Sequence, residues 1–356
     1  MKILTVVGAR PQFIKTAVIS KELRKQNREI LVHTGQHYDA SMSDIFFEEL
    51  EIPRPDYNLG INGGSHAKMT ARMMIGIEKI LEVEQPDAVL VYGDTNSTLA
   101  AALTTAKLHI PLVHVEAGAR TYSMSNPEEI NRLCTDHIST ILLASTERSL
   151  HNLEVEGLGK RSQFVGDAMY DAFLQYKDRA QLTTPRLKLI NESMLEVPQT
   201  YYLLTCHREE NTVKEGALED ILEGMNTLEY PTIYPVHPRI REHAREICNR
   251  RGYSNVKLVE PVGYLESLYL TMNAKKVVTD SGGLQREAFF AEVQCITMLD
   301  FEVWPETMID NRNQLCRASK NELLKKLDSN QRVNRHYKPF GDGRASERIA
   351  DVFKNL

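Results

Sequence analysis

Val277-Val278-Thr279-Asp280-Ser281-Gly282-Gly283 joins a short apolar run to a helix-like segment at residues 284–291, and this stretch decides the fold. It predicts a strand that passes through a glycine turn directly into a helix. Such a turn directs bare backbone N–H groups outward at the positive end of the helix dipole, which suits a diphosphate. Glu287 lies one turn into the helix and can reach a sugar hydroxyl. We therefore expect this stretch to bind a phosphorylated sugar rather than a redox cofactor.

The same strand-to-helix order recurs along the chain of 356 residues. Strands are predicted at residues 2–7, 30–34, 88–92, 112–116, 141–144, 202–206, 232–235, 256–259, 276–279 and 294–298. Periodic, helix-like segments separate these runs, an order that implies parallel sheets with helices on both faces. The sequence therefore predicts an α/β protein with two doubly wound, Rossmann-like domains, at residues 1–168 and 169–340. A further helix is expected within residues 341–356.

The composition is that of an ordinary globular protein, with 42% hydrophobic and 26% charged residues. The net charge is −5 and no block of basic residues occurs, which argues against a nucleic-acid partner. No stretch approaches the roughly 18 apolar residues of a membrane helix, and the apolar run at residues 3–7 is too short for a signal peptide. Five scattered cysteines form no C-x-x-C pair and are expected to be reduced thiols. These features predict a cytoplasmic protein without a membrane partner.

Several motifs follow directly after predicted strands. Ligands of open α/β sheets bind beyond the carboxyl ends of the strands, so these motifs should gather at one edge of each sheet. They are Gly8-Ala9-Arg10, Gly35-Gln36-His37, Gly93-Asp94-Thr95, Glu116-Ala117-Gly118 and Cys206-His207-Arg208. Two sheets that face one another across a cleft would bring both sets together.

The turn after the first strand, Gly8-Ala9-Arg10-Pro11, lacks the G-x-G-x-x-G pattern of dinucleotide-binding folds. Arg10 and Lys15 bracket the start of the following helix, where two cations could neutralise a diphosphate. The alternative is a solvated first turn, because cations at a helix N-terminus oppose the helix dipole. Phosphate binding is the favoured interpretation.

Carboxylates stand at or after strand ends in the first predicted domain: Asp94, Glu116 and the pair Glu128-Glu129. Removing a proton from one face of a carbon and returning it to the other face needs two acid/base groups. Helix capping is the alternative for Asp94 and Glu128, which lie at the starts of predicted helices. Three acids at one sheet edge favour catalysis for the set.

His207 follows a strand of the second predicted domain, and its polar neighbours at residues 209–211 argue against a buried structural role. His237-Pro238 fits a rigid turn equally well. No H-E-x-x-H or EF-hand pattern occurs, so no metal site is expected. The chain also lacks a G-x-S-x-G elbow and an evident cysteine nucleophile.

Taken together, these residues resemble the non-hydrolysing UDP-N-acetylglucosamine 2-epimerase family over nearly the whole chain. The resemblance rests on short stretches that occur in order at the family's spacing. They are Gly8 through Lys15, His33 through His37, Tyr92 through Thr95, His114 through Gly118, Pro127 through Arg132, His207 through Asn211, His237-Pro238 and Asp280 through Gly283. The family has the two-domain fold of B-type glycosyltransferases, with its active site in the interdomain cleft and a last helix that crosses back to the first domain.

The resemblance implies a role for each matching position. UDP and its ribose would be held by Arg10, Lys15, Ser281, Gly282, Gly283 and Glu287. The sugar would be surrounded by the acid/base groups Asp94, Glu116, Glu128 and His207. A second, activating UDP-sugar would lie near Gln36, His37, Arg208 and His237. The family uses neither NAD nor a metal ion, so no cofactor is expected, and the resemblance implies a homodimer that acts on a UDP-sugar for polysaccharide biosynthesis.

One stretch departs from the family pattern. The family often has arginines where this chain has Leu299 and Trp304. A branch that acts on UDP-2,3-diacetamido-glucuronate also has tryptophan there and shares the stretch at residues 261–266, as do many members assigned to UDP-N-acetylglucosamine. The resemblance therefore defines the type of reaction better than it defines the sugar.

The sequence thus predicts reversible inversion at C2 of a UDP-linked 2-acetamido sugar, from UDP-N-acetylglucosamine to UDP-N-acetylmannosamine. The expected route is elimination of UDP to a 2-acetamidoglucal, followed by re-addition. An epimerase of UDP-2,3-diacetamido-2,3-dideoxy-glucuronate is the main alternative. A B-type glycosyltransferase would instead transfer the sugar to an acceptor, and a non-catalytic UDP-sugar sensor would only bind it.

Overall fold

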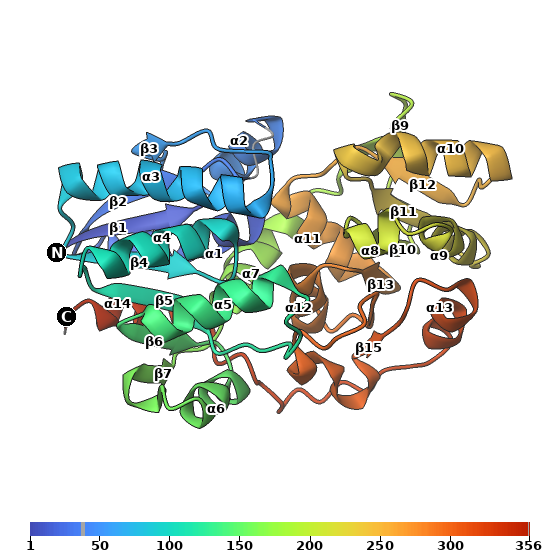
Figure 1. Ribbon diagram of the computed structural model, residues 1–356. Helices are drawn as coiled ribbons and strands as arrows, with labels where there is room; N and C mark the ends of the chain where they lie inside the picture. The colour runs from blue at the N-terminus through green and yellow to red at the C-terminus, as the bar shows by residue number, and fades with distance from the viewer. Residues whose placement is uncertain (37–39, 355) are drawn as a thin grey trace. The chain divides into compact units, whose positions relative to one another are not determined.

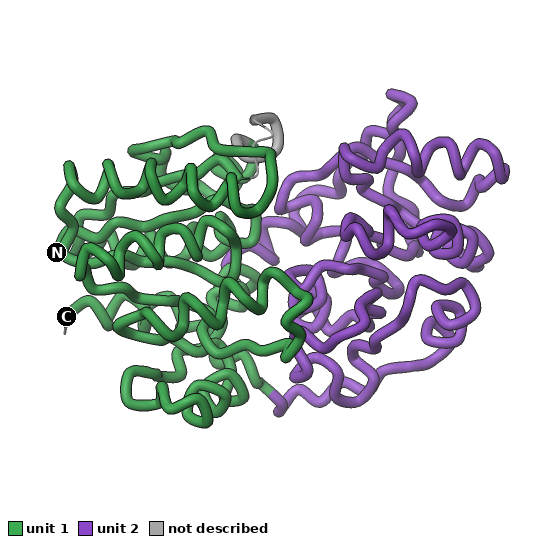
Figure 2. Tube along the Cα trace, viewed as in Figure 1, with its two compact units in different colours: residues 1–174, 338–356 green, residues 175–337 purple. Residues whose placement is uncertain are grey.

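The computed structural model describes residues 1–36, 40–354 and 356. His37, one of the residues expected near a second ligand, lies outside these ranges. The chain divides into two compact units, which Figure 2 shows in different colours. Unit 1 comprises residues 1–174 and 338–356, and unit 2 comprises residues 175–337. The predicted boundary between residues 168 and 169 falls within helix α7 (Ala168–Gln181), which spans the division.

Unit 1 is built on a parallel sheet with the strand order β3-β2-β1-β4-β5-β6-β7 (Figure 1). The strands are β1 (Lys2–Val7), β2 (Arg28–His33), β3 (Tyr57–Asn58), β4 (Ala88–Tyr92), β5 (Leu112–Ala117), β6 (Ile141–Ala144) and β7 (Ser162–Phe164). The helices are α1 (Arg10–Leu23), α2 (Ala40–Glu49), α3 (His66–Glu84), α4 (Asn96–Lys107), α5 (Pro127–Ile138), α6 (Glu147–Val155), the short η1 (Gly159–Arg161) and α14 (Ala345–Val352), together with the first part of α7. Because β1 pairs with β2 on one side and with β4 on the other, the winding direction reverses at β1. Ligands of such sheets bind at this switch point.

Unit 2 contains a second parallel sheet, with the order β12-β11-β10-β13-β14-β15. Its strands are β10 (Tyr202–Thr205), β11 (Thr232–Pro235), β12 (Val256–Val259), β13 (Lys276–Thr279), β14 (Cys295–Thr297) and β15 (Asn313–Leu315). The helices are α8 (Glu209–Thr212), α9 (Ala217–Asn226), η2 (Pro238–Ile240), α10 (Arg241–Arg251), α11 (Tyr264–Asn273), α12 (Gly282–Phe290), η3 (Pro305–Asn311) and α13 (Lys320–Leu327). A small antiparallel pair, β8 (Arg186–Lys188) and β9 (Met194–Glu196), precedes this sheet. Here the switch point lies between β10 and β13.

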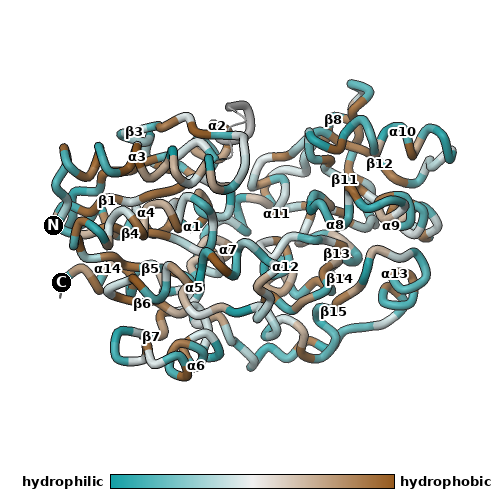
Figure 3. Tube along the Cα trace, viewed as in Figure 1, coloured by the Kyte–Doolittle hydropathy of each residue, from teal (hydrophilic) through white to brown (hydrophobic). Residues whose placement is uncertain are grey.

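The central strands are continuous apolar runs because helices cover both faces of each sheet. Every residue of β4 is fully buried, and Figure 3 shows the hydrophobic residues concentrated along the strands. Each buried side chain of this kind contributes roughly 1.5–3 kcal/mol. The predicted α/β fold with parallel sheets is confirmed. Within the described ranges, no helix has the length and apolar character required to cross a membrane.

Helix α14 is anchored in unit 1 by a buried carboxylate on α7. Asp171 Oδ1 accepts the N–H of Ala345 at 3.1 Å, and Oδ2 accepts both the N–H and the hydroxyl of Ser346 at 2.7 Å. These bonds satisfy N–H groups that have no partner within the helix. Burial raises the pKa of Asp171, although the bonds from Ser346 and Ala345 oppose this shift. The same helix packs on α1.

Candidate active site

Two carboxylates and two cations form a connected cluster at the carboxyl end of the unit 1 sheet. Asp94 follows β4, and Glu116 lies near the end of β5. Arg132, on α5, reaches both: Nη1 lies 2.7 Å from Asp94 Oδ2, and Nη2 lies 3.0 Å from Glu116 Oε1. Lys15, on α1, forms an ion pair with the other carboxylate oxygen of Glu116. The structure therefore brings three of the predicted site residues together around Arg132.

Burial determines how the members of this cluster can act. The side chains of Lys15, Glu116 and Arg132 are 3%, 6% and 3% exposed, whereas that of Asp94 is 28% exposed. The formal charges of the four groups cancel, and buried charges require such pairing. Burial lowers the pKa of Arg132, but the charges of Asp94 and Glu116 outweigh this effect and the net shift is upward. Arg132 thus stays charged, and Asp94 is the member most open to a ligand.

Glu116 adopts an unusual backbone conformation. Its φ is +68°, and the pairing of β5 with β6 shifts register between Val115 and Ala117. Backbone strain of this kind costs of order 1–3 kcal/mol and gathers at functional sites. Gly93 lies close by, with a φ of +63°, and a Cβ there would stand 3.4 Å from Glu116 Oε1 and 3.7 Å from Lys15 Nζ. These are ordinary contact distances, so the positive φ rather than a lack of space favours glycine at position 93.

The adjacent acids of α5 have different surroundings. Glu129 is buried and accepts the N–H groups of Thr121 and Tyr122 at 2.8 and 3.1 Å. It therefore holds the loop that precedes α5. Glu128 is half-buried, and its own N–H donates to Asn126 Oδ1 at 3.2 Å. Of the two, Glu128 remains the candidate acid/base group.

The first turn of unit 1 is fixed by a glutamine. Gln12 Oε1 accepts the N–H groups of Gly8 and Ala9 at 2.7 and 3.0 Å, so the turn after β1 is held closed against α1. Arg10 begins α1, and its guanidinium carbon lies 4.6 Å from the ring centroid of Phe46. Contact of Arg10 with a diphosphate stays a prediction, as does that of Lys15, which pairs with Glu116 in this structure.

Gln36, expected near a second ligand, lies on the loop after β2, and its side chain contacts the first turn of α4. Its Oε1 accepts the N–H and the hydroxyl of Ser97 at 3.1 and 2.7 Å. The Ser97 hydroxyl also lies 2.8 Å from Thr34 Oγ1, so these three polar side chains join the loop after β2 to α4. Within unit 1 this contact gives Gln36 a structural role, and a ligand role stays a prediction.

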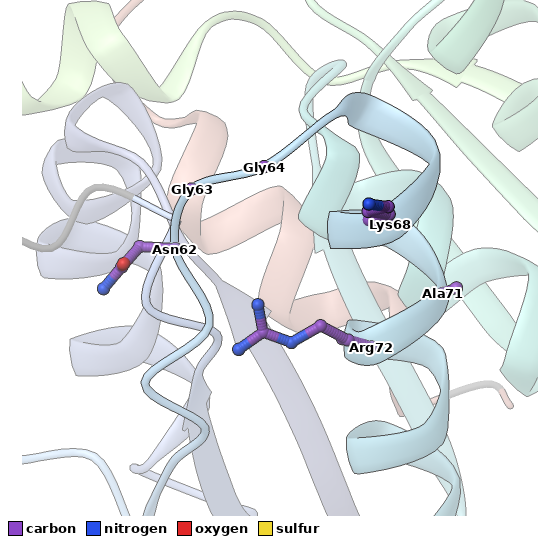
Figure 4. A pocket seen from close by; sticks show the side chains of 6 residues that line it. All are labelled: Asn62, Gly63, Gly64, Lys68, Ala71 and Arg72. Carbon is purple, nitrogen blue, oxygen red and sulfur yellow. The ribbon is translucent and has the colours of Figure 1, made fainter.

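A pocket opens between the loop before α3 and the first turns of that helix. Its lining residues are Asn62, Gly63, Gly64, Lys68, Ala71 and Arg72. Figure 4 shows the side chain of Arg72 extending from α3 toward the loop that carries Asn62. Among these described lining residues two are cations and none is a carboxylate. The pocket therefore lacks the acid/base pair that proton transfer at carbon needs.

The glycine turn of unit 2 leads directly from β13 into α12. Ser281 is the N-cap of this helix, and its hydroxyl accepts the N–H of Leu284 at 3.4 Å. Gly282 and Gly283 form the first turn, where backbone N–H groups and the helix dipole favour an anion. A Cβ at Gly282 would stand 3.5 Å from Trp304 Nε1, an ordinary van der Waals contact, so the indole ring lies directly beside this turn.

Trp304, which stands where the family often has arginine, is buried beside α12. The guanidinium carbon of Arg286 lies 4.1 Å from its ring centroid, a cation–π arrangement. Glu287, expected to contact a ribose, is buried on the same helix. Trp304 thus packs on α12 and positions a neighbouring cation.

A buried carboxylate joins the two strand ends at the switch point of unit 2. Asp280 Oδ2 accepts the main-chain N–H groups of His207 and Arg208, both at 2.8 Å. Asp280 Oδ1 lies 2.8 Å from His207 Nδ1. Burial alone would raise the pKa of Asp280, but the His207 imidazole and the two N–H groups lower it well below its usual value.

The remaining predicted residues of unit 2 lie beside this carboxylate. The rings of His207 and His237 are stacked, with centroids 6.3 Å apart and planes 23° apart. His237 Nδ1 accepts the N–H of Arg239 at 3.2 Å. Arg208 Nε donates to the carbonyl oxygen of Asp280 at 3.0 Å. His207, Arg208 and His237 are therefore gathered at one edge of the sheet.

Sequence reasoning gives no separate role to Arg132 or Asp280, although both fall within the matched stretches. A signal exists for Asp280, which follows a strand that is buried throughout. Arg132 has a weaker signal, its position one helical turn after Glu128. In the part of the chain that the structure describes, no cluster of three or more histidine, cysteine, aspartate or glutamate side chains could hold a metal ion.

Comparison with known proteins gives consistent matches over the whole chain. The model of the family described as UDP-N-acetylglucosamine 2-epimerase matches residues 21–354. A Methanococcus maripaludis protein named UDP-N-acetylglucosamine 2-epimerase homolog is 46% identical, and the match covers 100% of both chains. A Pseudomonas aeruginosa protein named UDP-2,3-diacetamido-2,3-dideoxy-D-glucuronate 2-epimerase is 43% identical, again over 100% of both chains. The crystal structure of Methanocaldococcus jannaschii UDP-GlcNAc 2-epimerase in complex with UDP-GlcNAc and UDP matches with a TM-score of 0.90 and 39% identity, covering 100% of both chains.

Proposed function

This chain belongs to the UDP-N-acetylglucosamine 2-epimerase family, a family of isomerases, and from that membership we propose that it inverts C2 of a UDP-linked 2-acetamido sugar. The preferred substrate in this proposal is UDP-N-acetylglucosamine, and the product is UDP-N-acetylmannosamine. The observation that carries the proposal is the charge-balanced cluster of Lys15, Asp94, Glu116 and Arg132, in which the carboxylate of Asp94 stays partly exposed. Such a group can exchange a proton with a bound sugar.

The proposed chemistry is elimination followed by re-addition. The C2 hydrogen has no adjacent carbonyl and is only weakly acidic, so direct abstraction would be slow. If the bond between C1 and the UDP oxygen breaks while a carboxylate takes the C2 proton, the products are UDP and a 2-acetamidoglucal. Return of UDP to C1, with a proton delivered to the opposite face of C2, gives the epimer. Atoms and charges balance without a cofactor.

The geometry of unit 1 suggests how the carboxylates divide the proton transfers. Asp94 is the most exposed acid of the cluster and is held by Arg132 through one oxygen. Glu116 has a cation on each of its oxygens, Lys15 on one and Arg132 on the other. We therefore assign the proton transfers to Asp94 and Glu128, and we assign to Glu116 the task of fixing Arg132 in place.

The turn of unit 2 suits the departing diphosphate. Ser281, Gly282 and Gly283 present the N-terminal end of α12, where N–H groups can stabilise the negative charge that develops as the C1–O bond breaks. Arg10 is the cation proposed to assist. In this scheme the elimination step depends on the α12 N–H groups and Arg10, which stabilise the negative diphosphate. The inversion at C2 depends on the carboxylates that transfer protons.

The first test is incubation with UDP-N-acetylglucosamine alone in D2O. We expect a new UDP-sugar that carries deuterium at C2, because both steps exchange the C2 proton with an acid/base group. Mass spectrometry and NMR would locate the label. Turnover without label at C2 would exclude this route. A glycosyltransferase or a non-catalytic sensor would form no new UDP-sugar without an acceptor, so the same assay separates those alternatives.

The second test concerns the sugar. The Pseudomonas relative is named for the diacetamido uronate, whereas the Methanocaldococcus structure contains UDP-GlcNAc. In this chain the uncharged residues Leu299 and Trp304 stand where the family often has arginines, so neither can pair with the carboxylate of a uronate. We expect a higher kcat/KM for UDP-N-acetylglucosamine. A preference above about tenfold for the uronate, equivalent to about 1.4 kcal/mol, would reverse this assignment.

We further propose that the protein acts as a cytoplasmic homodimer that supplies a sugar nucleotide for polysaccharide biosynthesis. The family resemblance supports this, and α3 offers Ile75 and Val83, which are 56% and 75% exposed, as apolar side chains for an interface. Light scattering on the purified protein would measure the mass. A mass equal to that of one chain across the micromolar range would exclude the dimer.

A further inference from the structure

We propose that Asp280 is a positioning residue for His207, which it holds with a proton on Nδ1 so that Nε2 is the ring nitrogen presented to the nucleotide sugar. The inference rests on the proposed function and on the acid/base role at the sugar that the family resemblance implies for His207. It goes further because it assigns a task to a carboxylate that cannot itself touch the ligand. Asp280 is fully buried, whereas the side chain of His207 is 39% exposed.

The position of the proton follows from the contact between the two side chains. An ionised carboxylate only accepts hydrogen bonds, and the low pKa of Asp280 keeps it ionised. His207 Nδ1 lies 2.8 Å from Asp280 Oδ1, an ion-pair contact, and this buried oxygen has no other hydrogen-bond donor among the described residues. An unprotonated Nδ1 would bring two acceptor atoms together at that distance. Nδ1 therefore carries a proton in both the neutral and the cationic imidazole. Proton exchange with a ligand is left to Nε2.

The contacts of the neighbouring His237 favour the opposite tautomer. His237 Nδ1 accepts a backbone N–H from Arg239, so a neutral His237 carries its proton on Nε2. Two cations lie near His207: Arg208, and Arg239, whose Nη2 lies 3.5 Å from the His207 carbonyl oxygen. Of the two stacked histidines, His207 is the one whose Nδ1 contacts the carboxylate of Asp280.

The remaining contacts of Asp280 make the test selective. Its Oδ2 accepts three donors: the N–H groups of His207 and Arg208 and the amide of Asn211 at 3.3 Å. In Asp280→Asn the amide oxygen is expected to stay on these donors, which places its NH2 group against His207 Nδ1. Nδ1 must then accept, and the proton moves to Nε2. The substitution thus reverses the tautomer while the loop contacts remain.

The experiment compares the full-length protein with Asp280→Asn by ¹⁵N NMR of labelled histidine and by turnover of UDP-N-acetylglucosamine. We expect protonated Nδ1 on His207 in the unmodified protein, protonated Nε2 in the variant, and a fall in kcat/KM of about 100-fold or more. Asn211→Ala is the control: it removes a donor to the same carboxylate but leaves the His207 Nδ1 contact, so the tautomer should not change.

A double-mutant cycle separates positioning from a general structural role. In His207→Asn the amide N–H takes the place of Nδ1–H toward Asp280, while Nε2 is lost. Adding Asp280→Asn to this background should change kcat/KM by less than about threefold, since the effect of Asp280 passes through His207. The inference would be overturned if Asp280→Asn lowered kcat/KM as much in the His207→Asn protein as in the wild-type protein. It would also be overturned if His207 kept its proton on Nδ1 in Asp280→Asn, or if that variant kept kcat/KM within about threefold of the wild-type value. A protein that forms no epimer would refute the proposed function, and the NMR comparison would still decide the tautomer.

Discussion

Asp94→Asn is expected to lower kcat by about 100-fold or more and to leave the affinity for UDP nearly unchanged. A positioned acid/base group contributes roughly 10²- to 10⁴-fold to rate, and an amide cannot take up the C2 proton. The amide oxygen can still accept from Arg132, so the cluster should keep its arrangement. Calorimetry with UDP and a turnover assay would measure the two quantities on the same preparation.

A matched control for this variant is Asp342→Asn, also in unit 1. Asp342 forms an ion pair with Arg348 at 2.7 Å, but its side chain is 54% exposed and lies on the loop before α14. Surface ion pairs contribute about 0–1 kcal/mol, so this variant should keep full activity. If Asp94→Asn also kept full activity, Asp94 would have no part in the proton transfers.

Arg132→Met is expected to lower the free energy of unfolding by about 3–5 kcal/mol and to abolish most activity. The variant removes a buried cation shared by Asp94 and Glu116, and it leaves Glu116 with Lys15 as its remaining partner among the ion pairs described above. Removing one partner of a buried ion pair leaves a charge without compensation, which has this effect on stability. Urea unfolding followed by circular dichroism would measure the midpoint and slope.

Arg132→Lys is the informative companion to that variant. Lysine restores the charge but supplies one ammonium group in place of the forked guanidinium that reaches two carboxylates. Stability should recover in part, whereas kcat should stay low because Asp94 and Glu116 lose their common anchor. An unchanged urea midpoint for Arg132→Met would show that the cluster is not a source of stability.

Most of the fold could be predicted because buried parallel strands are continuous apolar runs that stand out between helical patterns. The strands that sequence reasoning does not predict are short and lie at sheet edges, such as β3, β7 and β15. The pair β8–β9 lies in a polar stretch at residues 177–199, where its alternation is too brief to recognise. Pairing with a neighbouring strand, rather than local preference, forms these elements.

The candidate site could be predicted where local pattern defines it and not where distant residues do. The Ser281 cap and the glycine turn follow from sequence because their contacts lie within a few residues. The different surroundings of Glu128 and Glu129 depend on N–H groups in the loop at residues 121–122, which no spacing rule identifies. The contact between Asp280 and His207 joins positions 73 residues apart in the chain, and only the sheet topology brings them together.

The return of residues 338–356 to unit 1 has a consequence for how the chain folds during synthesis. Unit 2 is one uninterrupted segment, so it can fold as soon as it leaves the ribosome. Unit 1 must wait, because α1 lacks the helix that packs on it, and Asp171 lacks its hydrogen-bond donors, until α14 has been translated. Unit 1, which is synthesised first, is therefore completed last. A nascent chain stalled before residue 345 would carry a folded unit 2 and an incomplete unit 1, and the incomplete unit would be accessible to chaperones and proteases.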